Sequence, residues 1–368
     1  MAIATSTSMP SLPWRQTARV WAHHLMAFVL PVTCVVYLAT GPWTGWGAAA
    51  WLLVLAGSVL ADMRSPSEHR QPAPTLSGWP FDWVLYVLSA LHLLALVLLV
   101  RQVASNGFWT LDTFVAILLV GVNSGYSGIV VAHELLHRPQ PTLHFLGRVL
   151  MGSVLYEHFA TEHIRGHHTR VGLPEDPATA RFDETYFQFF RRTVPAQFRS
   201  AWQIESTRLG DGQMQLTDPR MLRHGVLHGV LVESVVALGL LVGLGVGAFA
   251  AYILQASIAV RLLEAVNYFE HWGLTRRGRR VTAVDSWDTD SRFTLYTLVG
   301  LSRHADHHAW ASRPYQQLRF WEESPKLPYG YFGTVVLLLV WNSRFRALMT
   351  QELQARRLGP FAEADSAA

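Results

Sequence analysis

The sequence predicts an all-α integral membrane protein with six transmembrane helices and a cytosolic cap that carries clusters of histidine. Three observations lead to this fold class. Half of the 368 residues are hydrophobic and only 15% are charged, whereas soluble domains average about 25% charged. The apolar residues gather in long runs nearly free of charge, and the basic residues concentrate between alternate runs. High hydrophobicity with low charge also excludes a disordered chain.

Six apolar runs approach the length at which a helix crosses a bilayer, which is about 20 residues within a range of ~17–25. Polar, proline or glycine breaks separate the first four, and a glycine-rich turn around Gly243, Gly245 and Gly247 divides the last two. One such run is often a buried core helix, but six in one chain favour membrane spans. The expected spans cover about residues 25–41, 44–61, 82–100, 112–132, 226–246 and 248–267.

Arginine placement predicts which side of the membrane each loop occupies. If the N-terminus is cytosolic, all but two of the 30 Lys and Arg residues fall on the inner side, the exceptions being Arg101 and Arg261. Short loops rich in positive charge stay in the cytoplasm. We therefore expect a multi-pass protein of the inner or cell membrane with cytosolic N- and C-termini. The basic excess belongs to this face, so no nucleic-acid partner is expected.

Two long polar stretches and a polar tail complete the expected organisation. Residues 133–223 and 267–330 lie on the expected cytosolic side and form the cap. Residues 331–341 are apolar but too few to span, which suits an interfacial or re-entrant helix. We expect one membrane-embedded domain over residues 1–350 and a polar C-terminal tail over residues 351–368.

Seventeen histidines stand against one cysteine, Cys34. One cysteine excludes a disulfide framework, a thiolate zinc site and a cysteine-ligated cluster within this chain. Any metal is therefore expected to be held by imidazole and carboxylate. Nine histidines fall into four clusters at the cytosolic ends of spans or in cytosolic loops. The nine expected ligands are His133, His137, His163, His167, His168, His271, His304, His307 and His308.

The spacing within the clusters is typical of metal ligands. His133 and His137 are four residues apart, and so are His163 and His167, which places each pair on one face of a helix. Nine imidazoles exceed what one ion uses, since zinc sites take about three or four ligands. Two ions with four or five imidazoles each fit the number. Ligand softness leaves iron, copper, zinc and nickel open.

The acids near these histidines are expected to support them. A metal-bound imidazole normally donates its other N–H to a carboxylate or a carbonyl. We assign this role to the acids that interleave with the ligands, with simple solvation as the alternative for Glu134 and Asp306. His158 lies five residues before His163 and is left out of the ligand set. The interleaved acids are Glu134, Glu157, Glu162, Glu270 and Asp306.

The four clusters resemble the histidine boxes of the membrane-bound alkane monooxygenases, which stand beside xylene monooxygenase within the membrane fatty acid desaturase and hydroxylase superfamily. The resemblance covers roughly residues 80–320, with the boxes in the same order. The Asn-Tyr-x-Glu-His box separates this family from generic desaturases. The boxes are His133-Glu134-x-x-His137, Glu162-His163-x-x-Gly166-His167-His168, Asn267-Tyr268-x-Glu270-His271-x-Gly273-Leu274 and Arg303-His304-x-Asp306-His307-His308. The stretches Pro174-Glu175-Asp176-Pro177-Ala178 and Arg313-Pro314-Tyr315 also resemble the family.

The resemblance implies a non-haem di-iron site, held almost wholly by histidine, with O2 as co-substrate. An enzyme of this kind inserts one oxygen atom into a C–H bond of a hydrophobic substrate and releases the other as water. The resemblance also implies electrons from rubredoxin or ferredoxin, served by an NAD(P)H-dependent reductase. An arginine-rich face suits an acidic electron carrier. Leu136, Arg138, Trp272 and Ala305 depart from the family pattern, which leaves alkane-like and alkyl-aromatic substrates both open.

Three other functions are weighed. A fatty acid or lipid desaturase or hydroxylase of the same superfamily would be distinguished by its product. An intramembrane zinc metalloprotease would use His133-Glu134-x-x-His137, but it leaves seven of the nine clustered histidines without a role. A metal transporter or sensor would bury polar residues in broken helices at mid-membrane, whereas the expected spans are nearly free of clustered histidine.

Overall fold

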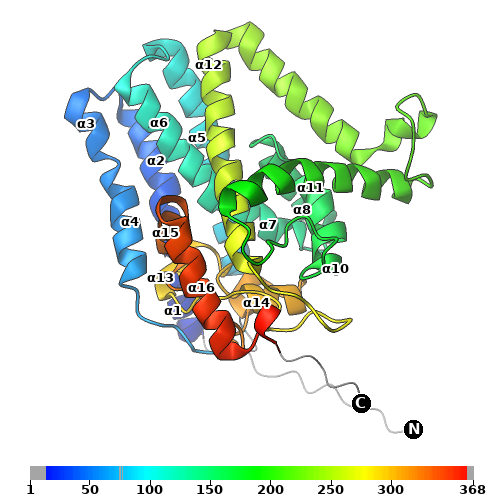
Figure 1. Cartoon of the computed structure of the whole chain (residues 1–368). Coiled ribbons are helices and arrows are strands. Elements are labelled where there is room, and N and C mark those ends of the chain that lie inside the picture. Colours follow the sequence, from blue (N-terminus) through cyan, green and yellow to red (C-terminus); the bar gives the residue numbers. More distant parts are fainter. Residues whose placement is uncertain (1–13, 74–75, 77, 363–368) are drawn as a thin grey trace, which may run out of the picture.

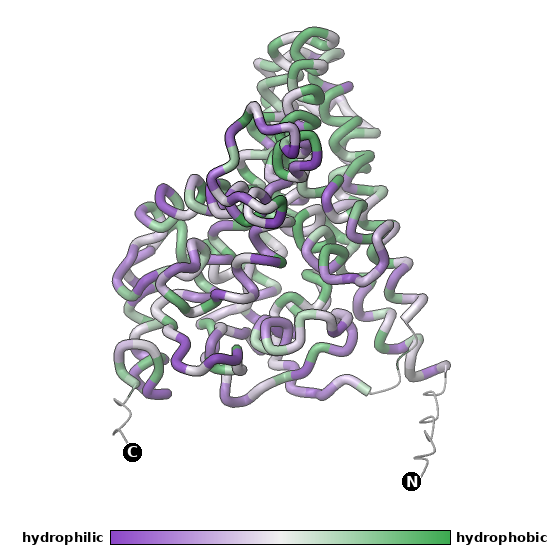
Figure 2. Tube along the Cα trace, turned by 90° about the vertical axis from the view of Figure 1, so that its right-hand side faces the viewer, coloured by the Kyte–Doolittle hydropathy of each residue, from purple (hydrophilic) through white to green (hydrophobic). Residues whose placement is uncertain are grey.

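The computed structural model describes residues 14–73, 76 and 78–362, and over these residues the protein is built from helices and loops (Figure 1). Two isolated β-bridges, Ser67–Ser291 and Asp288–Lys326, join loops of the cap. Figure 2 shows hydrophobic colouring toward the narrow end of the molecule and more hydrophilic colouring toward its wide end. The predicted all-α membrane fold class is confirmed.

Five helical stretches are long and apolar enough to cross a membrane. The first joins α1 (Trp14–His24), η1 (Leu25–Phe28) and α2 (Val29–Thr40), and the second joins α3 (Gly45–Ala50) and α4 (Leu53–Met63). The third is α5 (Trp79–Asn106), the fourth joins α6 (Leu111–Asn123), η2 (Ser124–Ile129) and α7 (Val130–Leu136), and the fifth is α12 (Gly225–His271). The candidate spans are Thr17–Thr40, Gly45–Met63, Trp79–Asn106, Leu111–Leu136 and Gly225–His271.

The first span shows how hydropathy misplaces a helix end. The candidate span starts at Thr17, eight residues before the expected start at residue 25, and its helix begins at Trp14. The added residues are mixed polar and apolar, so they extend the helix into the cap without adding to the apolar run. Trp21 is one of them, and its indole Nε1 donates to the carbonyl oxygen of Pro80 at 2.9 Å.

Helix α12 is 47 residues long and is broken at Gly245, where φ is 87° and ψ is 175°. Glycine adopts positive φ without a Cβ clash, and the break falls at the middle one of the three glycines of the expected turn. Figure 1 shows two arms that meet at the top of the bundle. The second arm descends inside the bundle, whereas the first leans away from it. Residues 226–246 and 248–267 are therefore two arms of one broken helix, and the count of six spans stays a prediction.

The cap consists of several short helices, the longer helix α11 and two C-terminal helices, α15 and α16. A capping box closes the start of α11, since Thr185 and Gln188 exchange side-chain and backbone hydrogen bonds. The cap elements are α8 (Pro141–Gly152), α9 (Phe159–Thr161), η3 (Glu162–His167), α10 (His168–Arg170), α11 (Tyr186–Arg208), η4 (Pro219–Arg223), α13 (Arg292–Thr297), α14 (His304–Ala309), η5 (Tyr315–Gln317), α15 (Tyr331–Val340), α16 (Asn342–Arg356) and η6 (Gly359–Phe361).

The short apolar helix expected at residues 331–341 is α15, and it is too short to span. Buried Asp62, near the end of the second span, fastens it to the bundle by accepting from the backbone N–H of Gly333 at 2.9 Å. The same carboxylate accepts from the hydroxyls of Ser291 and Thr294, each at 2.6 Å. The expected polar tail begins inside α16, which stays helical to Arg356, and residues 363–368 lie outside the described part. The division into a domain and a tail stays a prediction.

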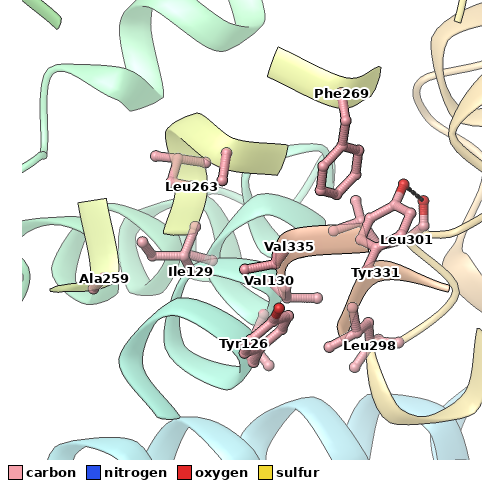
Figure 3. Close-up of a cluster of buried hydrophobic side chains, with 14 of the residues drawn as sticks. Tyr126, Ile129, Val130, Ala259, Leu263, Phe269, Leu298, Leu301, Tyr331 and Val335 are labelled. Carbon is pink, nitrogen blue, oxygen red and sulfur yellow. Dashed lines mark hydrogen bonds between the residues drawn. The ribbon is translucent and has the colours of Figure 1, made fainter. Parts of the chain in front are cut away.

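The main hydrophobic core lies where the fourth span, the second arm of α12 and α15 meet (Figure 3). Tyr126, Ile129 and Val130 come from the fourth span, and Leu263 comes from α12. Tyr331 of α15 packs edge-to-face on Phe269, with ring centroids 4.7 Å apart. This core lies next to the histidine clusters and fixes the ends of the helices that carry them.

Candidate metal centre

The nine clustered histidines come from four separate parts of the chain. His133 lies in α7, and His137 follows at the C-cap of that helix. η3 and α10 carry the second cluster, α12 ends on the third at His271, and α14 carries the last. All four chain segments approach one another on the cap side of the bundle.

Side-chain geometry divides the nine into two groups, each with its candidate ligand atoms within 4.8 Å of one another. All nine predicted residues are placed, and each belongs to one group. His158 belongs to neither, and its ring packs against Tyr156 at 4.4 Å and Phe198 at 5.2 Å. The five-histidine group is His133, His137, His163, His168 and His307, and the four-histidine group is His167, His271, His304 and His308.

The imidazole nitrogens are spaced as ligands of a shared ion would be. In the five-histidine group, Nε2 of His163 lies 3.0 Å from Nε2 of His137 and 3.1 Å from Nε2 of His168. In the four-histidine group, Nε2 of His167 and His308 are 3.2 Å apart. Nitrogens bound at ~2.1 Å to one ion, with bond angles near 90–109°, lie about 3.0–3.4 Å from each other. The donor set and its spacing therefore fit metal ions.

Burial keeps these imidazoles in the form that binds metal. It lowers the pKa of the cap histidines well below the ordinary value, and neighbouring imidazoles lower it further because two cations close together repel. Neutral imidazole carries the free lone pair that a metal needs. The histidines so affected are His137, His163, His168, His304, His307 and His308.

Two π-helical segments adjoin the centre. η2 lies just before the turn that carries His133, and η3 contains His163 and His167. Such turns occur often at functional sites. Gly166 explains the glycine of the second box, because a Cβ there would lie 2.6 Å from the carboxylate oxygens of Glu162.

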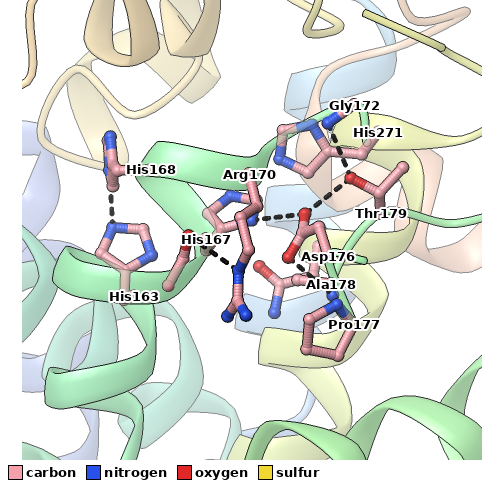
Figure 4. A network of polar contacts seen from close by, with 12 residues as sticks. His163, His167, His168, Arg170, Gly172, Asp176, Pro177, Ala178, Thr179 and His271 are labelled. Carbon is pink, nitrogen blue, oxygen red and sulfur yellow. Dashed lines mark hydrogen bonds and ion pairs between the residues drawn. The ribbon is translucent and has the colours of Figure 1, made fainter. Parts of the chain in front are cut away.

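Asp176 supports the four-histidine group, a role that the sequence did not assign to it. Its Oδ2 accepts from Nδ1 of His167 at 2.9 Å and from the hydroxyl of Thr179 at 2.6 Å (Figure 4). Burial alone would raise the pKa of Asp176, but His167 and Thr179 bring that pKa below its ordinary value. An ionised carboxylate thus orients His167 with Nε2 toward the group. The feature that could have indicated this role is the position of Asp176, which lies between two short turns and nine residues after His167.

Glu270 lies on the ligand side of the four-histidine group. Its Oε2 is 3.2 Å from Nε2 of His304, which itself lies 3.3 Å from Nε2 of His271. Its other oxygen accepts from the hydroxyl of Tyr331 at 2.5 Å. The sequence analysis expected Glu270 to accept from the outer N–H of a metal-bound imidazole. In the structure its carboxylate instead lies beside Nε2 of His304, the nitrogen that faces the other imidazoles of the group.

The other four predicted supporting acids pair with cationic or backbone groups. Glu134 accepts from Arg138 at 2.8 Å, and Asp306 accepts from Arg313 and from Nε1 of Trp321. Glu162 pairs with Arg170, and Glu157 pairs with Arg148. Among the described residues, none of these four acids has a hydrogen bond to one of the nine imidazoles. They hold the segments that carry the boxes, and their support of bound imidazole stays a prediction.

A narrow apolar cavity ends on both groups. His133 and His163 line it from the five-histidine group, and His304 and Glu270 line it on the other side. Its volume is about 30 Å³, enough for one small molecule such as water. A hydrocarbon chain therefore requires the wall to move. The apolar wall consists of Gly125, Tyr126, Ile129, Val130, Phe159, Leu262, Leu263, Val266, Leu298 and Leu301.

Comparisons with known proteins agree with this architecture. The family model described as fatty acid desaturase matches residues 108–336. The chain is 36% identical to alkane 1-monooxygenase 1 of Pseudomonas aeruginosa over 320 residues, covering 81% of this chain and 79% of that protein. It is 32% identical to alkane 1-monooxygenase 2 of Alcanivorax borkumensis over 358 residues, covering 91% and 89%. It is also 25% identical to the xylene/toluene monooxygenase hydroxylase component of Pseudomonas putida over 214 residues, covering 56% and 55%.

Proposed function

The chain belongs to the fatty acid desaturase family, on the branch of the alkane monooxygenases, and from this premise we propose that it inserts one oxygen atom of O2 into a C–H bond of an alkane-like or alkyl-aromatic substrate. The resemblance of the histidine boxes is thereby confirmed. The protein is an oxidoreductase of the membrane, and its family acts with bound metal. The convergence of nine imidazoles into two groups carries this proposal.

Each histidine group is proposed to hold one iron ion. Imidazole suits iron, and a cage of neutral ligands leaves the positive charge of the ions uncompensated, which favours binding of reduced oxygen. When bound, the two irons would supply activation of O2, so that substrate, O2, two electrons and two protons give an alcohol and water. The nine histidines named above are the proposed ligands, with Glu134, Glu270 and Asp306 as supporting acids.

The chain's own residues position the substrate. The apolar wall of the cavity surrounds the space between His133, His163 and His304, and once this wall moves it would guide a hydrocarbon toward that space. Tyr331 donates to Glu270 and fixes the orientation of that carboxylate beside His304. Because residues of the fourth span and of α12 form much of its wall, a lipid-dissolved substrate would enter the cavity from the bilayer once that wall moves.

An aromatic and cationic surface on the cap is the proposed dock for rubredoxin or ferredoxin, which an NAD(P)H-dependent reductase would serve. Trp310 and Trp321 stack with ring centroids 5.5 Å apart. The guanidinium groups of Arg313 and Arg319 lie over Trp310, at 4.8 Å and 4.9 Å from the ring centroid. Nε1 of Trp321 donates to Asp306 at 2.8 Å, and Asp306 lies within the last box. An acidic carrier on this surface would be close to the proposed iron site.

We further propose six spans in the inner or cell membrane, with both termini cytosolic. The arginine-rich cap supports this orientation. The first described helix begins and the last described helix ends on the cap side (Figure 1).

Purified protein tests the proposal by its metal content and its products. We expect close to two irons per chain, and a terminal alcohol from an added alkane or a benzylic alcohol from an alkylbenzene when electrons are supplied. One zinc and no iron would instead indicate the protease. A double bond or a mid-chain alcohol in an acyl lipid would indicate the desaturase or lipid hydroxylase of the same superfamily.

A further inference from the structure

A second cavity lies between the first arm of α12, helix α5 and helix α8, and we call it the wedge. Its volume is about 990 Å³, at the upper end of the ~300–1,000 Å³ of small-molecule sites. We propose that the wedge binds a long-chain primary alcohol, with the hydroxyl at its polar floor and the chain along the arm. This inference rests on the proposed function, because such an alcohol is the product of that reaction.

The walls of the wedge suit an alkyl chain. On the arm, one face lines the cavity, because its residues recur every three or four positions. α5 supplies the facing wall with the same spacing. The arm from Gly225 to Leu244 is about 30 Å long at 1.5 Å per residue, so an extended chain can lie along it. The apolar lining includes Val232, Val236, Leu240 and Leu244 on the arm and Leu93, Leu96, Val97 and Val100 on α5.

The floor of the wedge is polar and holds a buried acceptor. Glu157 pairs with Arg148, and its backbone N–H donates to Oε1 of Glu233 at 2.8 Å. Oε2 of Glu157 is buried, and no hydrogen-bond partner for it occurs among the described residues. Gly229 leaves room for this oxygen, since a Cβ there would collide with it. His228 completes the floor.

The charges of the floor select the head group. At the floor, Glu157 and Glu233 stand against one arginine, Arg148, so a phosphate or carboxylate head there would meet net repulsion. The second arginine of the lining, Arg101, comes from α5. A hydroxyl is neutral and donates one hydrogen bond, which the free oxygen of Glu157 can accept. An alkane has no group to satisfy that oxygen, so the floor distinguishes the product of hydroxylation from its substrate.

A row of polar side chains connects the wedge with the catalytic cavity. Ser153 lines the wedge, and its hydroxyl lies 2.8 Å from Nε2 of His92. Gln255 donates to the carbonyl oxygen of Ser153 at 3.4 Å and accepts from the hydroxyl of Ser124 at 2.8 Å. Ser124 begins η2, and the second residue after it, Tyr126, lines the catalytic cavity. Polar groups within spans are costly and mark pathways, and this row, buried at His92, Gln255 and Ser124, lies between the wedge and the π-helical segment that lines the catalytic cavity.

The test measures binding without turnover. Purified, metal-loaded protein in lipid nanodiscs is given tritiated 1-dodecanol or dodecane with no electron donor, and binding is measured at equilibrium. We expect 1-dodecanol to bind at least about tenfold more tightly than dodecane, since a hydrogen bond to a charged group distinguishes them. Equal binding of the two ligands would overturn the inference. Displacement of 1-dodecanol by an equal concentration of lysophosphatidylglycerol would overturn the choice of occupant.

Two variants assign the binding to the wedge. Val232→Trp and Val236→Trp each fill it from the arm at positions that are 62% and 44% exposed, so the fold is expected to persist. Both should weaken 1-dodecanol binding at least about tenfold. Val235→Trp is the matched control, because Val235 is 69% exposed and lies outside the lining. Binding by both filled variants that equals that of the control would overturn the inference.

Failure of the wedge inference and failure of the proposed function give different results. If alkane is converted to alcohol while 1-dodecanol does not bind the wedge, the wedge inference alone fails. If 1-dodecanol binds the wedge while no hydroxylated product forms from any alkane or alkylbenzene, the proposed function fails and the wedge is not a product site.

Discussion

The four-histidine group and the five-histidine group differ in what surrounds their imidazoles. All members of the four-histidine group are buried, and two carboxylates lie against it, Asp176 behind His167 and Glu270 beside His304. In the five-histidine group, His137 and His168 are partly exposed. Among the described residues, no carboxylate has a hydrogen bond to an imidazole of this second group.

The two groups would surround their proposed ions in different ways. The four-histidine group gains basicity and fixed orientation from carboxylates that its rings contact. The five-histidine group instead has one more imidazole and more access to solvent. We therefore expect the smaller group to depend on every ligand and on its carboxylates, and the larger group to tolerate more loss.

The largest effect is expected from His308→Ala. It removes one of four imidazoles from the buried group, and its loss should abolish hydroxylation and reduce the iron content from two per chain toward one. The His167→Ala variant should lose hydroxylation and iron to the same extent. Iron analysis and product formation on the purified membrane protein measure both effects.

The matched control for these variants is His224→Ala. His224 is buried outside both groups and caps α12 through its Nδ1, which accepts from the N–H of Leu227 at 3.1 Å. Iron content near two per chain and nearly unchanged activity are expected. Full activity in His308→Ala would contradict the ligand assignment.

A smaller metal loss is expected from His168→Ala in the five-histidine group. Four imidazoles remain there, so iron content should stay above that of His308→Ala while activity falls by more than about 100-fold, the upper range for removal of an outer partner. Equal iron loss in both variants would remove the distinction between the groups.

Asp176→Asn tests the carboxylate support of the buried group. The substitution keeps the shape of the side chain but removes the charge that orients His167. A loss of about 10–100-fold in metal affinity or activity is expected. Glu175→Gln, one residue earlier on the exposed side of the loop, provides the control. If the two variants have equal activity, Asp176 has only a structural role.

The smallest effect is expected from Tyr331→Phe. It removes the hydrogen bond to Glu270 without removing the ring, and one hydrogen bond contributes about 0.5–1.5 kcal/mol. Activity should fall about 2–10-fold, with iron content unchanged. Iron loss comparable to that of His308→Ala would mean that Glu270 itself holds the metal.

The sequence predicted which histidines gather but not how they divide. Spacing of four residues places two rings on one face of an α-helix, and His133 and His137 do share a group. For His163 and His167 that expectation is wrong: they lie in the π-helix η3, whose wider turn aligns His163 with His168 instead. His167 and His168 nevertheless belong to different groups, as do His307 and His308. Successive residues on a helix point about 100° apart, so neighbours in the sequence face different histidine groups, and only the tertiary arrangement determines which.

Other features depended on contacts that a linear pattern does not contain. Asp176 reaches His167 through a loop, so no periodicity connects them. A glycine-rich stretch marked the turn between two apolar runs, but a linear pattern does not contain the direction in which the first arm leans away from the bundle (Figure 1). The sequence analysis did not predict the start of the first span or the end of α16, because polar residues continue both helices.

The division of neighbouring histidines between the groups links the two sites mechanically. A single peptide bond connects His167 to His168, and another connects His307 to His308. Each proposed ion would therefore be held by backbone that also positions ligands of the other, and the covalent chain would limit their separation at two points. Under this proposal, we expect the two ions to bind cooperatively.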